Sequence, residues 1–260
     1  MHSRSKNVVT SPTSTPPSVR LALIVTAAAV VYACDQAGPT EPTLPEGMPN
    51  VAVTPGVTML CQVGLGATFE VRVGLNAAPR ELSVPDGGCE TVATVNPAQQ
   101  DDVVVSVVEK PGTYYVVDRL VIQHGDEPAR VMAATSSASF EGAHGAVLTY
   151  FNNAAVNVCE FGAGATFQYQ VGLGTAFREL DVPDGQCTRV ASVAPASANA
   201  TAAADDVIVT VREVASPRYR LDNLELALGA LSPDRYTDRD GISFEALHGA
   251  TVTFRNRRIP

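Results

Sequence analysis

An alternation of apolar and polar residues with a period of two is the dominant pattern along this chain. Every second residue is apolar from Phe69 to Leu75, and the stretch from Phe167 to Leu173 repeats the same phase. This period places apolar side chains on one face of a β-strand. After the first 33 residues, no segment shows the apolar stripe of a helix. We therefore expect an all-β fold.

Further short strands follow from the same pattern, separated by segments rich in turn-forming residues. They are expected around residues 57–63, 80–84, 89–95, 103–109, 114–123 and 146–152. Strands at a spacing of roughly 8 to 12 residues are typical of a sandwich or barrel of immunoglobulin size.

The chain contains an internal repeat. RELSVPDGGCETVATV at 80–95 returns as RELDVPDGQCTRVASV at 178–193, and the segments before and after it return as well. A near copy in each half predicts two tandem immunoglobulin-like β-sandwich domains, at residues 54–153 and 154–260.

Each copy carries Val-Pro-Asp-Gly before a cysteine, at 84–87 and 182–185. Proline presets its φ angle, aspartate can cap its own turn, and glycine can adopt a positive φ. We therefore predict a hairpin turn, with the cysteine at the head of the next strand.

Five cysteines are present. Cys61, Cys89, Cys159 and Cys187 fall two per copy with identical spacing, as structural disulfides of an exported protein do. The positions favour Cys61–Cys89 and Cys159–Cys187, although four cysteines allow three connectivities. The fifth, Cys34, needs another role.

Residues 1–33 carry three cations, no acid and an apolar run at 21–33. That run is shorter than the about 20 residues that span a bilayer. These features predict a secretory signal peptide. The sequence VYAC at 31–34 resembles the lipobox of bacterial lipoproteins, which implies a lipid on Cys34; a plain secretory signal is the alternative.

Residues 34–53 are rich in Pro, Thr, Glu and Gly, a composition that predicts a flexible tether. Without the signal peptide the chain has 15 basic and 27 acidic residues, a formal net charge of −12. This charge argues against nucleic acid as a partner. The expected membrane contact is the lipid.

Three strand motifs carry a family resemblance. They are the first strand VNVCE, the middle strands VVVSVVE and VIVTVRE, which end at Glu109 and Glu213, and the last strands VLTYFN and VTFRN, which end at Asn152 and Asn256. Each copy, over nearly its whole length, resembles the prealbumin-like, collagen-adhesin B-type domains of bacterial surface proteins and pilins. The resemblance implies a prealbumin-like β-sandwich. In that family a first-strand lysine is joined to the last-strand asparagine, and the middle glutamate is the buried catalyst.

The lysine is missing here, because Gln62 and Glu160 occupy its position. Lysine occurs only at positions 6 and 110. We therefore predict no isopeptide bond in either copy, with the disulfide as the stapling bond instead.

The phase of their strands places Glu109 and Glu213 on the inward face. A bare buried carboxylate is costly, so each is expected to pair with arginine or backbone N–H groups, or to reach water at the strand end. This reading gives them a structural role.

Candidate metal ligands are sparse. Glu-x-x-His occurs before the last strand of each copy, ending at His144 and His248, but residues three apart on a strand point to opposite faces. Asp234, Asp238 and Asp240 could offer oxygen ligands to calcium. The default expectation for these residues is a solvated acidic loop. We expect no cofactor.

Together these features predict a non-catalytic, membrane-anchored lipoprotein of the cell envelope, facing the periplasm or the outside. It would act as a spacer or adhesion module with a protein or polysaccharide partner. The alternatives are a periplasmic hydrolase or metal-dependent enzyme, and a carrier of a small ligand.

Overall fold

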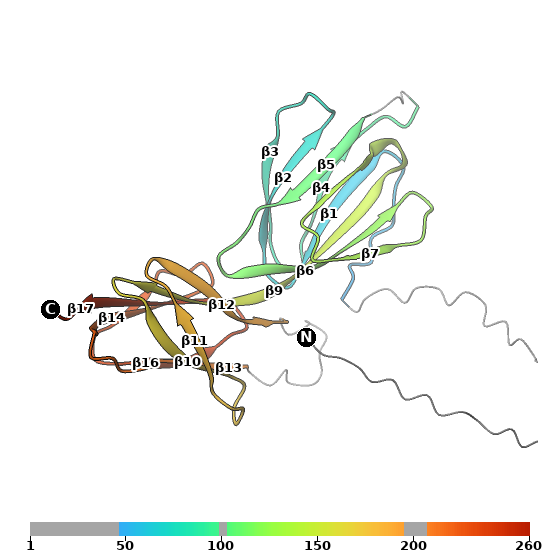
Figure 1. Cartoon of the computed structure of the whole chain (residues 1–260). Helices are drawn as coiled ribbons and strands as arrows, with labels where there is room; N and C mark the ends of the chain where they lie inside the picture. Colours follow the sequence, from blue (N-terminus) through green and yellow to red (C-terminus); the bar gives the residue numbers. More distant parts are fainter. Residues whose placement is uncertain (1–46, 99–102, 195–206) are drawn as a thin grey trace, which may run out of the picture. The chain divides into compact units, whose positions relative to one another are not determined.

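The computed structural model describes residues 47–98, 103–194 and 207–260 (Figure 1). Regular structure in these ranges is β-strand, apart from the 3₁₀ turn Gly142–His144, so the all-β prediction is confirmed. No helix in these ranges is long and apolar enough to cross a membrane. The predicted signal peptide, Cys34 and residues 35–46 of the tether lie outside the described residues.

The first copy forms a two-sheet sandwich. Its strands are β1 (Val57–Val63), β2 (Ala67–Val73), β3 (Arg80–Val84), β4 (Cys89–Thr94), β5 (Val104–Glu109), β6 (Tyr115–His124), β7 (Arg130–Ala133), β8 (Ser137–Glu141) and the first part of β9 (Ala146–Phe161). One sheet has the order β7-β6-β9-β1-β4, and the other has the order β3-β2-β5-β8.

The second copy repeats this topology. It uses the second part of β9 together with β10 (Ala165–Val171), β11 (Arg178–Val182), β12 (Gln186–Val193), β13 (Ile208–Glu213), β14 (Tyr219–Leu228), β15 (Asp234–Tyr236), β16 (Gly241–Glu245) and β17 (Ala250–Arg258). Its sheets have the orders β15-β14-β17-β9-β12 and β11-β10-β13-β16. The prediction of tandem β-sandwiches is therefore confirmed.

Strand β9 belongs to both copies. Residues up to Ala154 pair with β1 and β6, and residues from Ala154 onward pair with β12 and β17. It is thus the last strand of one sandwich and the first strand of the next. The domain boundary placed between residues 153 and 154 falls inside this continuous strand.

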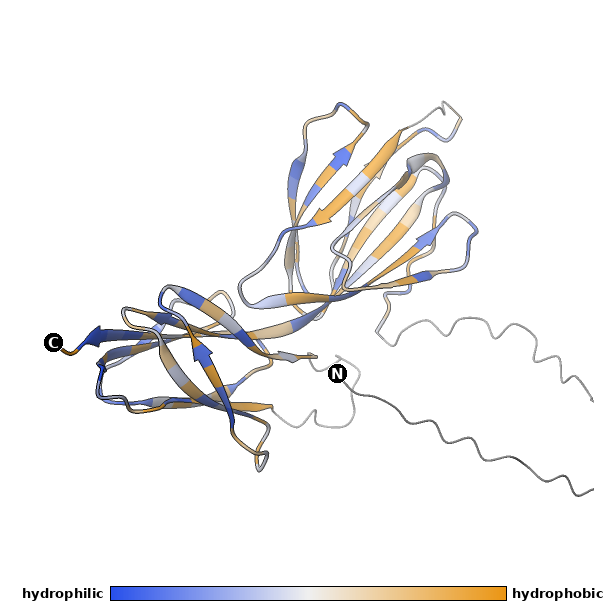
Figure 2. Ribbon diagram, viewed as in Figure 1, coloured by the Kyte–Doolittle hydropathy of each residue, from blue (hydrophilic) through white to orange (hydrophobic). Residues whose placement is uncertain are grey.

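The buried apolar residues form two separate clusters, one in each copy. Figure 2 shows hydrophobic residues along much of β5 and hydrophilic residues in β11 and at the C-terminal end of β17. The expectation that Leu75 and Leu173 continue the inward face is wrong, because these side chains are 69% and 80% exposed. Strands β2 and β10 end two residues earlier, before Gly74 and Gly172, whose positive φ angles break the alternation.

The Val-Pro-Asp-Gly segments form turns, but the prediction of a hairpin is wrong. Strand β3 pairs with β2 whereas β4 pairs with β1, so the turn carries the chain from one sheet to the other. The aspartate does not cap its own turn either. Asp86 Oδ1 accepts a hydrogen bond from the Gly64 N–H at 2.7 Å, and Asp184 Oδ1 accepts one from the Gly162 N–H at 2.6 Å. Each turn is therefore fastened to the connection that leaves the first strand of its copy.

Candidate functional site: two buried acid–amide clusters

The first cluster consists of Gln62, Glu109 and Asn152. Gln62 on β1 lies opposite Tyr150 on β9, and Asn152 follows Tyr150 by two residues, so the two amide side chains lie on the same face of one sheet. Glu109 ends β5 in the other sheet, opposite Phe69 on β2. All three cluster residues are buried.

The second cluster repeats this register with Glu160, Glu213 and Asn256. Glu160 on β9 lies opposite Phe254 on β17, and Asn256 follows Phe254 by two residues. Glu213 ends β13, opposite Phe167 on β10. Glu160 is fully buried and Glu213 is half-buried.

An aromatic pair joins the two sheets beside each cluster. The ring centroids of Phe69 and Tyr150 are 5.0 Å apart, and those of Phe167 and Phe254 are 4.6 Å apart. These distances lie in the range where aromatic rings attract one another.

In the first cluster the two sheets are joined by a hydrogen bond between side chains. Asn152 Nδ2 donates to Glu109 Oε1 at 2.5 Å and lies 3.5 Å from the Leu65 carbonyl oxygen. The partner of Glu109 is thus an amide, and not the arginine or backbone N–H expected from the sequence. Glu109 Oε2, Gln62 Oε1 and Asn152 Oδ1 have no hydrogen-bond partner among the described residues. A proton on Glu109 would supply a donor to this group of acceptors.

In the second cluster one amide serves two carboxyl groups. Asn256 Nδ2 donates to Glu160 Oε2 at 3.0 Å and also donates to Glu213 Oε1. The Ala163 N–H donates to Glu160 Oε1 at 3.3 Å. Two acids that share one neutral donor repel each other when both are charged, so this arrangement favours a protonated member.

Burial raises the pKa of the three carboxyl groups and so favours their uncharged form. It raises the pKa of Glu109 and that of Glu213 to about 7, against the lowering effect of the asparagine hydrogen bond. Burial likewise raises the pKa of Glu160. The pKa of Tyr150 is raised by burial and then by the neighbouring Glu109 charge. Each cluster therefore takes up or releases protons close to pH 7.

The disulfides lie next to the clusters. Cys61 is bonded to Cys89 and Cys159 to Cys187, with Cα–Cα distances of 4.1 Å and 4.0 Å. Each pair is directly opposite on neighbouring strands, and the first cysteine precedes the cluster residue on its strand. By chain entropy, closing a loop with a sequence separation of 28 residues contributes about 3.5 kcal/mol.

The other candidates remain apart from these clusters. Asp234 lies in β15, and Asp238 and Asp240 lie in the connection to β16. In the described ranges, no three His, Cys, Asp or Glu side chains come close enough to hold a metal ion. Glu141 and His144 lie 3.8 Å apart, contrary to the expected opposite faces, because a 3₁₀ turn replaces the strand there.

Sequence reasoning missed part of each cluster. The motifs indicate only that Gln62 and Glu160 stand in place of a lysine, whereas the structure shows both as buried polar residues of the clusters. The motifs do not indicate the ring contacts of Tyr150 and Phe254 either. The repeat itself contains the information that would identify these residues. Both copies have a polar residue, an aromatic residue and an asparagine at equivalent positions.

Comparison with known proteins identifies no family. No family model matches the chain, and no curated protein matches it. The major pilin of Streptococcus pyogenes aligns at 11% identity over 81% of this chain and 100% of the pilin, with a TM-score of 0.29. The T-13 pilin protein of the same organism aligns at 10% identity over 80% and 98%, with a TM-score of 0.30. A mutant of the major pilin aligns at 10% identity over 78% and 98%, with a TM-score of 0.32. At these values the likeness carries no argument about function.

Raising the pH from about 5 to about 8 is expected to destabilise the wild-type chain through Glu109 and Glu213. Their folded-state pKa of about 7 exceeds the ordinary value of 4.5, so the folded form binds more protons in this window and loses stability as pH rises. For the buried Glu109 the loss is at most about 3 kcal/mol, at about 1.4 kcal/mol per pKa unit. Urea unfolding at several pH values measures it.

The double variant Glu109→Gln/Glu213→Gln should lose most of this pH dependence, because an amide does not titrate. The matched control is Glu90→Gln, which removes an exposed acid of β4 and should keep the wild-type slope. An unchanged slope in the double variant would contradict the assignment.

Proposed function

We propose that this chain is a non-catalytic lipoprotein of the cell envelope, with a lipid on Cys34 and two sandwiches that act as a spacer or adhesion module. The chemically suggestive carboxyl groups support a structural role, because Glu109 and Glu213 occupy equivalent positions in the two copies and each accepts a hydrogen bond from the asparagine of its cluster. Glu109 is 3% exposed and Glu160 is 0% exposed. A substrate cannot contact a carboxyl group in such a position.

The observation that carries the proposal is the pairing of the first and last strands of each copy. β1 and β9 are parallel neighbours, and so are β9 and β17. When a chain is pulled from its two ends, parallel terminal strands are loaded in shear, so all the hydrogen bonds between them share the force at once. This is the arrangement that a load-bearing spacer needs.

The disulfides join the first strand of each copy to its neighbour on the side away from the last strand. Cys61 on β1 is bonded to Cys89 on β4, and Cys159 on β9 is bonded to Cys187 on β12. The single lysine of the described residues, Lys110, forms an ion pair with Glu81 at the surface. We therefore propose that the disulfides staple the copies and that neither copy contains an isopeptide bond.

Pulling the mature chain between residues 53 and 260 is expected to unfold each copy at high force. Attachment at residues 53 and 127 should unfold the first copy at clearly lower force. Both of those points lie at the end of the sheet where β1 begins and β6 ends, so the strands separate one bond at a time. Single-molecule force spectroscopy makes the comparison, and equal forces in the two geometries would refute the spacer proposal.

Anchoring is tested by Cys34→Ala. The wild-type chain is expected in the membrane fraction, and the variant is expected in the soluble fraction because it has no acceptor for the lipid. Cys61→Ala/Cys89→Ala serves as the control, since it removes a disulfide and should stay membrane-bound. Proteolysis of intact cells then reports which face carries the sandwiches. Retention of Cys34→Ala in the membrane would rule out the lipid anchor.

The absence of an isopeptide bond predicts an intact mass reduced only by the hydrogens of the disulfides. Glu160→Lys is expected to lose one ammonia in addition. The introduced amine would lie beside Asn256, attack its Cγ and expel Nδ2 as ammonia, with Glu213 relaying the proton. The further change Glu213→Gln should abolish the loss. Ammonia loss in the wild type, or none in folded Glu160→Lys, would contradict the roles given to Glu160, Glu213 and Asn256.

A further inference from the structure

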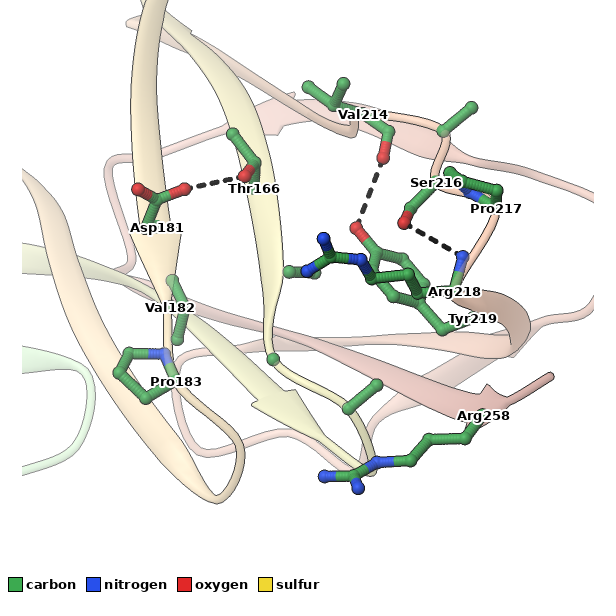
Figure 3. Close-up of a pocket in the computed structure, with 14 residues that line it drawn as sticks. Thr166, Asp181, Val182, Pro183, Val214, Ser216, Pro217, Arg218, Tyr219 and Arg258 are labelled. Carbon is green, nitrogen blue, oxygen red and sulfur yellow. Dashed lines mark hydrogen bonds between the residues drawn. The ribbon is translucent and has the colours of Figure 1, made fainter. Parts of the chain in front are cut away.

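A cavity of about 660 Å³ opens at the end of the second sandwich (Figure 3). It lies where β10 begins, β11 ends and the chain passes from β13 to β14. Its lining consists of residues 163–166, 181–183, 214–219 and Arg258. The spacer role proposed above makes no use of this cavity.

The uncharged part of the lining is largely apolar or already paired. Val182, Pro183 and Val214 are among its apolar residues. The Tyr219 hydroxyl donates to the Val214 carbonyl oxygen at 3.3 Å, and the Thr166 hydroxyl donates to Asp181 Oδ1 at 2.6 Å. Ser216 Oγ accepts a hydrogen bond from the Arg218 N–H at 3.2 Å. The cationic groups of the lining are the side chains of its two arginines.

Two arginines, Arg218 and Arg258, flank Tyr219. Arg258 is the strand partner of Tyr219, and the Ile259 N–H donates to the Arg218 carbonyl oxygen at 3.0 Å. Both side chains are exposed, and neither guanidinium has a hydrogen bond or an ion pair with the described part of the chain.

Other arginines of the same sheet are paired with acids. Arg235 and Arg255 both bind Glu225, and Arg257 lies 3.5 Å from Asp222. The two guanidiniums at the cavity therefore differ from these neighbours in having no acid beside them.

The scaffold does not require these two charges. The equivalent positions of the first copy hold Tyr114 and Ala154, and the equivalent backbone hydrogen bond is kept there, from the Ala155 N–H to the Tyr114 carbonyl oxygen at 2.9 Å. The fold is thus the same with neutral residues. The cationic pair is a property of the second copy alone.

The positive charge of the two arginines and the apolar residues of the lining indicate which chemical class of ligand the cavity fits. A guanidinium binds a carboxylate through two parallel hydrogen bonds. Two arginines and Asp181 give the lining a net charge of one positive unit, which one carboxylate balances and a polyanion does not. We propose that this cavity binds the carboxylate of a ligand with a small apolar body. That chemistry belongs both to a peptide C-terminus with an apolar last residue and to a free aliphatic acid.

The test is calorimetric titration of the full mature chain with three probes. They are acetyl-Gly-Ala-Val with a free carboxylate, the same peptide as its C-terminal amide, and isovalerate. The free-acid peptide or isovalerate should bind saturably, and the amide should bind at least about tenfold more weakly. Binding of the peptide alone identifies a peptide source, and binding of isovalerate identifies a free acid.

Arg218→Gln and Arg258→Gln should each weaken binding about tenfold, because each removes a charge-assisted pair. Both residues are exposed, so an unchanged melting temperature confirms folding. Arg220→Gln is the matched control: it removes the same charge from β14 outside the cavity and should leave the affinity unchanged. The proposal is overturned if no probe binds at millimolar concentration, if the amide binds equally well, or if neither cavity variant changes the affinity. None of these results bears on the pulling experiment.

Discussion

Strand β9 must pair in the correct register with the strands of both sandwiches, and the rest of the structure depends on that constraint. It supplies Asn152 to the first cluster and Glu160 to the second, and both side chains point inward. The two residues are an even number of positions apart, so they share one phase of the strand. A slip of one residue would turn both out of their cores and bring their neighbours in. The register of β9 is therefore specified from both ends.

Burying an acid beside an amide does not stabilise a core by itself. Desolvation costs several kcal/mol for a charged group, and a protonated carboxyl avoids only part of that cost. Glu109 has one amide donor and an oxygen without a partner. The stability of each copy must come from other sources, which are the aromatic pair, the apolar cluster around it and the disulfide. Because neighbouring residues of a strand face opposite sides, Cys61 fastens the outer side of the strand whose inner side carries Gln62.

The strands with a strong alternating pattern could be predicted closely, and β1 and β3 begin and end at the expected residues. Strands β7 and β15 could not, because they are short, largely exposed and without alternation. The turn at Asp86 was recognised from its chemistry, but its partner Gly64 was not, since the fold alone brings these residues together. The phase of their strands and the resemblance to collagen-adhesin B-type domains predict the inward positions of Glu109 and Asn152. Their mutual hydrogen bond spans two sheets, and no local pattern encodes it.

The two clusters differ in their number of acids, and this difference is related to the cavity at the end of the second copy. The second cluster contains one more acid, because Glu160 takes the place of Gln62. A second buried acid is tolerable only where water or dipoles can reach it. Ala163, whose N–H binds Glu160, and Val214, which follows Glu213, both line the open cavity. Glu213 is accordingly half-buried, whereas Glu109 is enclosed. The second copy thus keeps an additional acid next to the residues that line its open cavity, whereas the equivalent position of the first copy carries the buried neutral amide of Gln62.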